Sequence, residues 1–394
     1  MDKILEKNGV NFDLSADQRA LQDTAKRFAE NELGPLAKEL EESGEPVPHA
    51  WLKKYAENGF LGCNLPLADG GLGISNLDAM IVLEEFAKIS VAVAFPVFES
   101  VAGPIHVISR FAKPYIAKPL VQAVCRGEKV VAVSMSEPDA GTALTDLTTR
   151  GRVEGDQIVL NGQKRWCSGA GHADAYLVYC RMSDDPGAKG IGAVLVDKET
   201  PGLTFGPPEK LMGFRGVPSA DIFLDDVRLP LDNIVVPAGG FRLLMEAFDL
   251  ERCGNATMSL GLAAAALGQS LSYVETRKQF GKPIADFQAV QIRIAGMAMK
   301  VEAARLLVWR ALARNPDLPS LADTSIAKCF ANEIVREVCG DAVQLMGGYG
   351  YHKEFGAEQR FRDAWGWGIA GGTIDIQKIN IAGSLLQRRF NQRT

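Results

Sequence analysis

The hydrophobic spacing of this chain changes twice, and that order limits the folds open to it. From residue 13 to about 88, leucines and phenylalanines recur near the 3.6-residue period of an amphipathic helix, with Ser15 placed as a helix cap. From 130 to about 237, short β-rich runs alternate with Gly, Pro and Asn-Gly turns. Helical spacing then returns, and long helices are predicted over 241–275, 285–314, 320–346 and 373–388.

The length agrees with this division. At about 150 residues per domain, 394 residues correspond to two or three domains, and 47% apolar residues can form a large core. Fibrous, low-complexity and disordered classes are thereby excluded. We predict an α+β multidomain fold with an N-terminal α-helical domain (1–125), a middle antiparallel β domain (126–238) and a C-terminal four-helix bundle (239–394).

Charge and cysteine content limit the classes of binding partner and the cellular compartment that we expect for this protein. Lys and Arg number 43 against 48 Asp and Glu, so no basic excess is available for nucleic acid. The first ten residues are too polar for a signal peptide, and the longest small-apolar run, 261–267, is too short to span a membrane. Seven cysteines without a CxxC pair indicate free, mostly buried thiols. We expect a cytoplasmic protein without membrane insertion.

The four histidines lie far apart in the sequence, at positions 49, 106, 172 and 352. A zinc site or a Ser-His-Asp triad would have to depend on one isolated imidazole. We therefore predict no metal.

Small residues mark one stripe of the first long C-terminal helix. Gly254, Gly261 and Gly268 recur every seven residues among alanines. Because glycine inside a helix costs about 1 kcal/mol, such a stripe is usually kept for close packing. We interpret it as a packing surface within the helical bundle rather than as a chemical site.

No standard nucleotide-binding loop is present. The chain has neither GxxxxGK[ST] nor a GxGxxG between a strand and a helix. The segment from Ser134 to Thr142 leaves a strand and offers hydroxyls, backbone amides and a glycine. Asn161 to Lys164 predicts a hairpin, and Trp166 and Ser168 follow on one strand face, where an indole and a hydroxyl suit a planar heterocycle.

These two segments resemble the flavin-binding signatures of the acyl-CoA dehydrogenase superfamily. Other segments, from about residue 13 to 388, resemble further family motifs in the same order: Lys210 to Gly216, Asp225 to Val227, Arg277 to Ile284, Phe287-Gln288, Gln344 to Tyr351, Arg362 to Ala364 and Gly371 to Thr373.

The resemblance implies FAD as cofactor. Residues 133–142 would wrap the isoalloxazine and a phosphate, with Trp166 stacking on the flavin and Ser168 bonding near N5. In this family the neighbouring subunit grips the adenine end, so a dimer or tetramer is implied. The cofactor-binding residues implied are Val133, Met135, Ser136, Gly141, Thr142, Trp166, Ser168, Arg277, Phe280, Gln288, Gln344, Gly347, Gly348, Thr373 and Asp375.

The catalytic base is the decisive residue of the resemblance. Desaturation of a thioester removes a weakly acidic α-proton, which suits a carboxylate in a dry pocket. Many members carry a Glu just before a C-terminal Gly-Thr, but here that position is Gly371. Isovaleryl-CoA dehydrogenase-like members carry it in a Leu-Asp-Leu-Glu-Arg stretch, which resembles 248–252 here. Glu251 is therefore the predicted base.

Periodicity supports this assignment independently. One helical stripe, largely apolar, contains Leu244, Phe248, Glu251, Asn255, Met258 and Leu262. A buried acid without a role is costly. The alternative is that Glu251 forms a structural ion pair, with Arg252 or with another segment.

The acyl group is less constrained. Residues 91–98, which line the acyl pocket in this family, lack Arg and Lys, which disfavours a dicarboxylic acyl group. Short branched, cyclic or aromatic groups remain open, and a plain core role for this run is equally compatible. The implied substrate-binding residues are Thr142, Phe95, Phe98, Phe248, Asp249, Arg252, Gly371 and Gly372.

Departures from the family pattern keep alternatives open. Thr142 is followed by Ala143 where Asp is usual, and the spacing from Glu354 to Arg360 is one residue longer than in the family. The runs 212–218 and 370–373 are similar to segments of a superfamily desulfinase.

We predict α,β-desaturation of an acyl-CoA with an electron-transferring flavoprotein as acceptor. A non-oxidising lyase or desulfinase, or an acyl-CoA-binding flavoprotein without turnover, are the alternatives.

Overall fold

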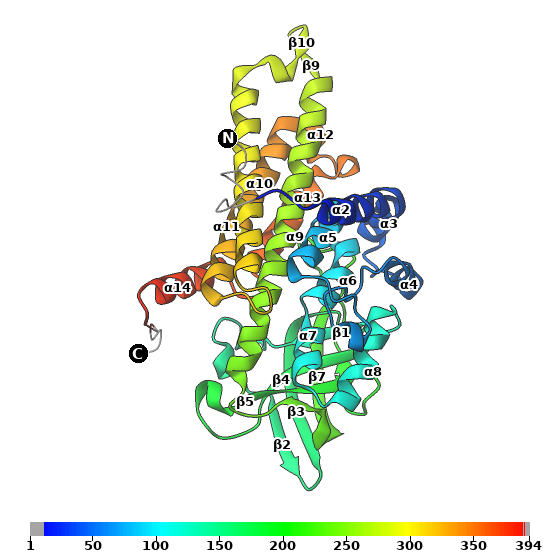
Figure 1. Ribbon diagram of the computed structural model, residues 1–394, viewed down its shortest axis with the longest axis vertical. Coiled ribbons are helices and arrows are strands. Elements are labelled where there is room, and N and C mark those ends of the chain that lie inside the picture. Colours follow the sequence, from blue (N-terminus) through cyan, green and yellow to red (C-terminus); the bar gives the residue numbers. More distant parts are fainter. Residues whose placement is uncertain (1–11, 389, 391–394) are drawn as a thin grey trace.

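The computed structural model describes residues 12–388 and 390, and these follow the predicted order of helices, sheet and helices (Figure 1). The prediction for residues 1–10 lies outside this range. Ser15 caps the first described helix in a reciprocal capping box with Gln18, as its position predicts. The N-terminal helices are α2 (Ala16–Phe28), α3 (Gly34–Ser43), α4 (His49–Glu57), α5 (Asn76–Ile89), α6 (Val91–Val101), α7 (Pro104–Phe111) and α8 (Pro114–Cys125).

The middle region is one eight-stranded sheet with the order β6-β7-β3-β2-β4-β5-β8, to which β1 adds beside β4. Most neighbouring strands are antiparallel, as predicted, but β4 pairs in parallel with β1 and, at one position, with β2, so the sheet is mixed. Parallel strands are usually joined through a helix, but no α-helix lies between β1 and β4. The parallel direction of this pair is therefore evident only from the pairing itself. The strands are β1 (Val131–Ser134), β2 (Arg150–Glu154), β3 (Gln157–Ser168), β4 (Ala175–Arg181), β5 (Ile191–Asp197), β6 (Leu203–Phe205), β7 (Ser219–Pro230) and β8 (Ile234–Val236).

The predicted hairpin at Asn161 to Lys164 is wrong, because these residues lie inside β3. The pairing of β3 with β7 shifts between Leu160 and Gly162, which marks an irregularity within a continuous strand. A Cβ at Gly162 would come within 2.6 Å of Thr149 Oγ1, so the glycine allows a close approach rather than a turn. The chain reverses between β2 and β3 instead, next to Gly155.

The C-terminal region is built on the long helices that the sequence predicts, with boundaries that differ by up to three residues. Two short helices between the last two, α12 and α13, were not predicted. α11 contacts α9, α10, α13 and α14 and is the centre of the bundle. The elements are α9 (Phe241–Thr276), β9 (Lys278–Gln279), β10 (Lys282–Pro283), α10 (Gln288–Arg314), α11 (Leu321–Met346), α12 (Gly348–Tyr351), α13 (Ala357–Trp367) and α14 (Ile374–Leu385).

Helix α9 connects the sheet to the far tip of the molecule (Figure 1). A Cβ at Gly254 would come within 2.8 Å of Ala102 Cβ, and one at Gly261 within 2.4 Å of Ala87 Cβ. Gly254 and Gly261 thus allow α6 and α5 of the N-terminal region to pack closely against α9, while Gly268 faces open space. The stripe is a packing surface as predicted, but its partners are N-terminal helices and not the bundle.

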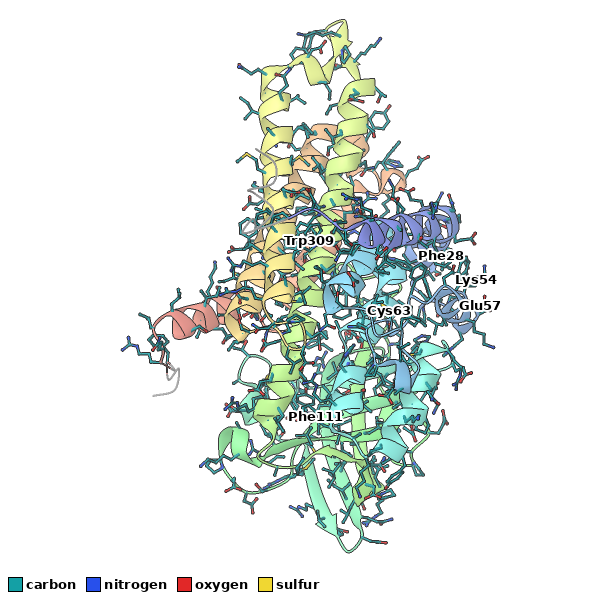
Figure 2. All side chains as sticks on the ribbon, viewed as in Figure 1. Phe28, Lys54, Glu57, Cys63, Phe111 and Trp309 are labelled. Carbon is teal, nitrogen blue, oxygen red and sulfur yellow. The ribbon has the colours of Figure 1, made fainter. Side chains whose placement is uncertain are left out.

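The core is shared between the helical regions and both sides of the sheet. Along β4, Leu177 and Tyr179 pack with α7 and α8, while Tyr176, Val178 and Cys180 pack on the other side. Figure 2 places Phe111, the last residue of α7, where the helices meet the sheet.

All seven cysteines are free and all but Cys125 are buried, as predicted. By length and composition, one described stretch, Val91–Phe111, could cross a membrane, and 83% of its most apolar window is buried inside the protein. It is a longer apolar stretch than the run at 261–267 on which the membrane prediction was based.

The domain boundaries remain predictions. Their neighbourhood is consistent with a change of structure, because α8 ends at Cys125, β1 begins at Val131, β8 ends at Val236 and α9 begins at Phe241.

Candidate active site

Glu251 lies on α9, which is buried on most sides between the sheet, α6 and α11. Its stripe neighbours Leu244, Phe248 and Met258 are buried. Protein atoms crowd the carboxyl although the side chain keeps partial access to solvent. Burial raises the pKa of Glu251 to about 8, against the opposing charges of Arg252 and Lys328. The position holds a carboxylate that is a much stronger base than an ordinary glutamate.

The alternative of a Glu251–Arg252 ion pair is wrong. Arg252 pairs with Asp249, one turn back on the same helix, and Asp249 also accepts a hydrogen bond from Thr324 Oγ1 at 3.0 Å. The Arg252 guanidinium also lies over the ring of Phe248, 5.2 Å from its centroid. Within the described part of the chain, Glu251 makes no ion pair.

The alternative base position, Gly371, opens onto the same space. A Cβ there would lie 3.5 Å from Asn255 Nδ2, 3.6 Å from Lys328 Cε and 3.7 Å from Phe248 Cζ. Asn255 is one turn along α9 from Glu251, so the two positions converge. No side chain competes with Glu251 from Gly371.

Next to this loop, Lys328 of α11 is fully buried and was not foreseen. Its Nζ donates to Asn332 Oδ1 (2.9 Å), Ala370 O (2.9 Å) and Gly372 O (3.0 Å), and burial lowers its pKa to about 7. Asn332 in turn donates to Asn255 Oδ1 at 2.9 Å. The ammonium thus fixes the loop around Gly371 to α11, and through Asn332 to α9. The four-residue spacing of polar Thr324, Lys328 and Asn332 was the sequence signal for it.

Beyond this loop, Thr373 caps α14 by accepting from Ile376 N at 3.4 Å, and Asp375 is exposed in the first turn. Gly372 also lies in the loop that Lys328 holds. None of these residues is near the segment 133–142 by any contact the structure gives.

One acidic side chain, Glu137, holds the predicted flavin-binding segment 133–142 in place. Glu137 accepts from Thr148 N at 2.6 Å and from Thr149 N at 2.9 Å, and it pairs with buried Lys164 at 2.8 Å. Lys164 also donates to Met135 O at 2.9 Å. These bonds hold the segment although Ala143 replaces the usual Asp.

Trp166 lies beside this segment, because Arg165 N donates to Ser136 O at 3.0 Å. Its backbone has a φ of +61°, and its indole is 53% exposed. An exposed indole in such a strained conformation is rare unless it contacts a ligand. Half-buried Ser168 follows, while Val133 lies in β1 and Gly141 and Thr142 are exposed. Trp166, Ser168 and the segment 133–142 form an open surface, which we call the flavin ledge. Its indole, hydroxyls and backbone groups fit the planar end of FAD.

The two phenylalanines of the predicted acyl pocket have different roles. Phe98 is buried against Gly254 and packs edge-on to Trp367, 5.5 Å between centroids, so it belongs to the core. Half-buried Phe95 lines a cavity of about 30 Å³ with Ser168 and Gly169. Glu99, one residue beyond the run 91–98, lines the same cavity and was missed because no periodic pattern marks its position.

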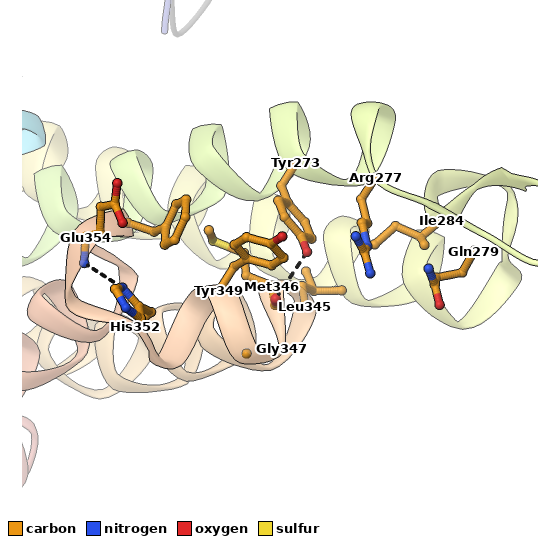
Figure 3. Close-up of a pocket in the computed structure, with 12 residues that line it drawn as sticks. Tyr273, Arg277, Gln279, Ile284, Leu345, Met346, Gly347, Tyr349, His352 and Glu354 are labelled. Atoms are coloured by element: carbon orange, nitrogen blue, oxygen red, sulfur yellow. Dashed lines mark hydrogen bonds between the residues drawn. The ribbon is translucent and has the colours of Figure 1, made fainter.

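The remaining cofactor residues gather at the other end of α9 (Figure 3). Arg277, Gly347 and Gly348 line a cavity of about 630 Å³ together with Tyr273 and Tyr349. At about 1.5 Å per residue, Arg277 is roughly 40 Å along α9 from Glu251. Phe280, Gln288 and Gln344 are exposed at this end. One chain therefore places the predicted FAD residues in separate regions: around Trp166, at the far end of α9, and, for Thr373 and Asp375, at the start of α14.

Two of the histidines are not isolated. His49 and His172 lie with ring centroids 5.3 Å apart, and burial together with His49 lowers the pKa of His172 to about 4. Among the described residues, no group of three His, Cys, Asp or Glu side chains could hold a metal ion.

Three family models match consecutive parts of the chain: the acyl-CoA dehydrogenase N-terminal domain at residues 15–128, the middle domain at 132–227 and the C-terminal domain at 238–386. A solved structure of butyryl-CoA dehydrogenase from Megasphaera elsdenii superposes with a TM-score of 0.92 at 31% identity, covering 96% of this chain and all of that one.

Curated relatives have diverse names. A 3-sulfinopropanoyl-CoA desulfinase from Variovorax paradoxus is 36% identical, over 97% of both chains. The CarC subunit of the caffeyl-CoA reductase-Etf complex from Acetobacterium woodii is 37% identical, over 95% of this chain and 99% of that one. Together with the three domain matches, these likenesses show that the chain belongs to the acyl-CoA dehydrogenase family.

Proposed function

We propose that this protein desaturates the α,β bond of an acyl-CoA thioester whose acyl group is short and branched, cyclic or aromatic. Its family is FAD-dependent, and its members are oxidoreductases that act on acyl-CoA. The proposal concerns the direction of the reaction, the acyl group and the residues that perform it.

Glu251 is the catalytic base of the proposal. Its carboxylate takes the α-proton onto a side-chain oxygen, and its elevated pKa brings its basicity closer to that of the carbanion-like α-carbon. FAD, when bound, supplies the acceptor for the hydride that leaves the β-carbon. Lys328 and Asn332 hold the loop around Gly371 in place, and the surrounding buried side chains exclude water.

The observation that carries the proposal is an acid without an ion-pair partner, largely enclosed by protein, at the place where two family positions for the base converge. A purely structural acid would have a cation or several donors around it. Arg252, the nearest cation in sequence, is instead engaged by Asp249.

The division of the cofactor residues supports a homo-oligomer, a dimer or tetramer. Arg277 lies roughly 40 Å along α9 from Glu251, and its cavity has no lining residue in common with the segment around Trp166, so a second copy would bring its Arg277 cavity to the ledge at Trp166. An electron-transferring flavoprotein is the proposed electron acceptor, supported by the name of the Acetobacterium woodii relative. The seven free thiols suit a cytoplasmic location.

A desulfinase is the second candidate, because one similar relative is named so. Cleavage of a C–S bond without net oxidation does not require a base for an α-proton, and Glu251 therefore favours desaturation. Binding of acyl-CoA without turnover is the third possibility.

An anaerobic titration separates these functions. The purified holoprotein is mixed with branched, cyclic and aromatic acyl-CoA thioesters, and the visible flavin band is recorded. Desaturation predicts bleaching by at least one thioester. Sulfite release from a sulfinate thioester without bleaching would identify a desulfinase, and a bound thioester with an unchanged band over hours would indicate binding alone.

A further inference from the structure

The carboxyl of Glu99 is an unpartnered acid inside the protein. Glu99 lies in the last turn of α6, its residue is 8% exposed, and its Oε2 has no hydrogen-bond partner. A Cβ at Gly103 would come within 2.8 Å of this oxygen, so the glycine leaves room for the carboxyl. Among the described residues, Glu99 makes no ion pair. A buried acid left in this state costs free energy unless a ligand completes its hydrogen bonds.

The cavity at Glu99 links it to the flavin ledge. Ser168, Gly169 and Phe95 line the same space of about 30 Å³, which is room for about one water molecule. Helices α6 and α9 cross at Gly254, where Phe98 and Ala102 pack closely, and this crossing brings Glu99 near Glu251. Only the small end of a ligand would reach this space.

The surroundings keep the carboxyl neutral. Burial first, and then the charge of Glu251, raise the pKa of Glu99 well above its ordinary value. Its place in the last turn of α6, where the helix dipole is negative, acts in the same direction. Glu99 lines the cavity described above together with His172, and it also lines a second cavity together with Lys129. Neither of these two titratable groups pairs with Glu99. A neutral carboxyl donates one hydrogen bond and accepts others, which matches a hydroxyl group.

We propose that Glu99 determines specificity by selecting acyl groups that carry a hydroxyl at the end remote from the thioester. The inference rests on the proposed function, because it places the acyl chain between Glu251 and Glu99. A plain alkyl or aryl end would leave the buried acid unpaired, and a carboxylate end would meet an acid and a second acid nearby without a cation.

The test compares thioesters that differ by one distal hydroxyl: pentanoyl-CoA with 5-hydroxypentanoyl-CoA, and 3-phenylpropanoyl-CoA with 3-(4-hydroxyphenyl)propanoyl-CoA. The kcat/KM for anaerobic flavin reduction is measured for the wild-type holoenzyme, Glu99→Leu and Glu99→Gln. Glu128→Gln, a change at an exposed acid of the same region, is the matched control.

We expect the wild type to prefer the hydroxylated member of at least one pair by about tenfold or more, the worth of one buried hydrogen bond. Glu99→Leu should abolish or reverse that preference, Glu99→Gln should retain most of it because an amide also donates and accepts, and Glu128→Gln should match the wild type.

The outcomes distinguish this inference from the proposed function. If neither these four thioesters nor the branched and cyclic ones reduce the flavin, the proposed function fails; if only the branched or cyclic ones reduce it, the specificity role is wrong. If the thioesters reduce it but the wild-type ratio is below twofold in both pairs, or is unchanged in Glu99→Leu, the specificity role is wrong while desaturation stands. The wild-type ratio decides the matter by itself if Glu99→Leu does not fold.

Discussion

At its N-terminal end α9 carries Glu251 among buried side chains from a single chain, whereas its C-terminal end leads to Arg277 in an open cavity lined by exposed residues. At the first site, burial shifts the pKa values of Glu251 and Lys328, and a hydrogen-bond network fixes the adjacent loop. At the second, the aromatic and guanidinium groups face open space. This difference is the basis of our proposal that the site at Glu251 is complete within one chain, whereas FAD binding requires a second copy.

Lys328→Met tests the internal support of the first site and should have the largest effect on stability. It leaves Asn332 Oδ1 without its donor and removes the ammonium donor from the carbonyls of Ala370 and Gly372, which keep only the amides of Asn255 and Gln377. The change should cost about 3 kcal/mol of unfolding free energy. Chemical denaturation measures this. Arg277→Ala, at the other end, should remain within about 0.5 kcal/mol of the wild type. Equal losses in both variants would contradict the contrast between the two ends.

The pH dependence of flavin reduction tests the electrostatics of the same site. Glu251 must be ionised to take a proton, and its raised pKa means that it is protonated below about pH 8. The rate at subsaturating thioester should therefore rise about tenfold per pH unit towards pH 8 and then level off. Because an acid with a raised pKa favours the folded state only while protonated, Glu251 should also destabilise the protein progressively between its unfolded pKa and pH 8. A rate profile already flat at pH 6 would show that the site does not shift this pKa.

Arg277→Ala tests the far end directly. If its guanidinium contacts a phosphate of the cofactor, loss of a charge-assisted hydrogen bond should weaken FAD binding by about 10- to 100-fold. Fluorescence of released FAD during dilution measures this, and mixing Arg277→Ala with a Trp166→Ala variant should restore binding at one site of each mixed dimer. Unchanged FAD affinity, or no recovery in the mixture, would place the cofactor elsewhere.

Gly254→Ala tests the helix crossing that forms the first site. Its Cβ would meet Ala102 Cβ and Phe98, so the change should destabilise the protein by about 1–3 kcal/mol. Gly268→Ala is the matched control, because it faces open space and should be neutral or stabilising by up to about 1 kcal/mol. Thermal unfolding of both variants gives the comparison. Similar behaviour of the two would mean that α9 does not pack closely against α6.

The sequence predicts the parts of this structure that depend on local pattern. The long helices, the position of Glu251 on an apolar stripe and the cap at Ser15 all follow from spacing. The Asn-Gly pair at 161–162 misleads because the glycine serves an approach of Thr149, a contact between two strands that spacing does not encode. The direction of β1 beside β4 is likewise a matter of pairing.

The residues that sequence reasoning missed owe their roles to distant contacts. Lys328 acquires its role only when the loop at 367–372 folds onto α11, and Glu99 only when α6 crosses α9. Both are buried titratable residues whose surroundings come mainly from distant segments, and spacing shows only the Lys328–Asn332 pair. Arg252 follows Glu251 in the sequence, but its ion-pair partner is Asp249.

The most direct test of the central claim is the anaerobic visible spectrum of Glu251→Gln after addition of a thioester that bleaches the wild type. Glutamine preserves the shape of the side chain and removes the base, so flavin reduction should slow by about 10²- to 10⁴-fold while the thioester still binds. Glu246→Gln, at a more exposed acid on the same helix, should bleach like the wild type. Reduction of Glu251→Gln at the wild-type rate would show that another group removes the α-proton.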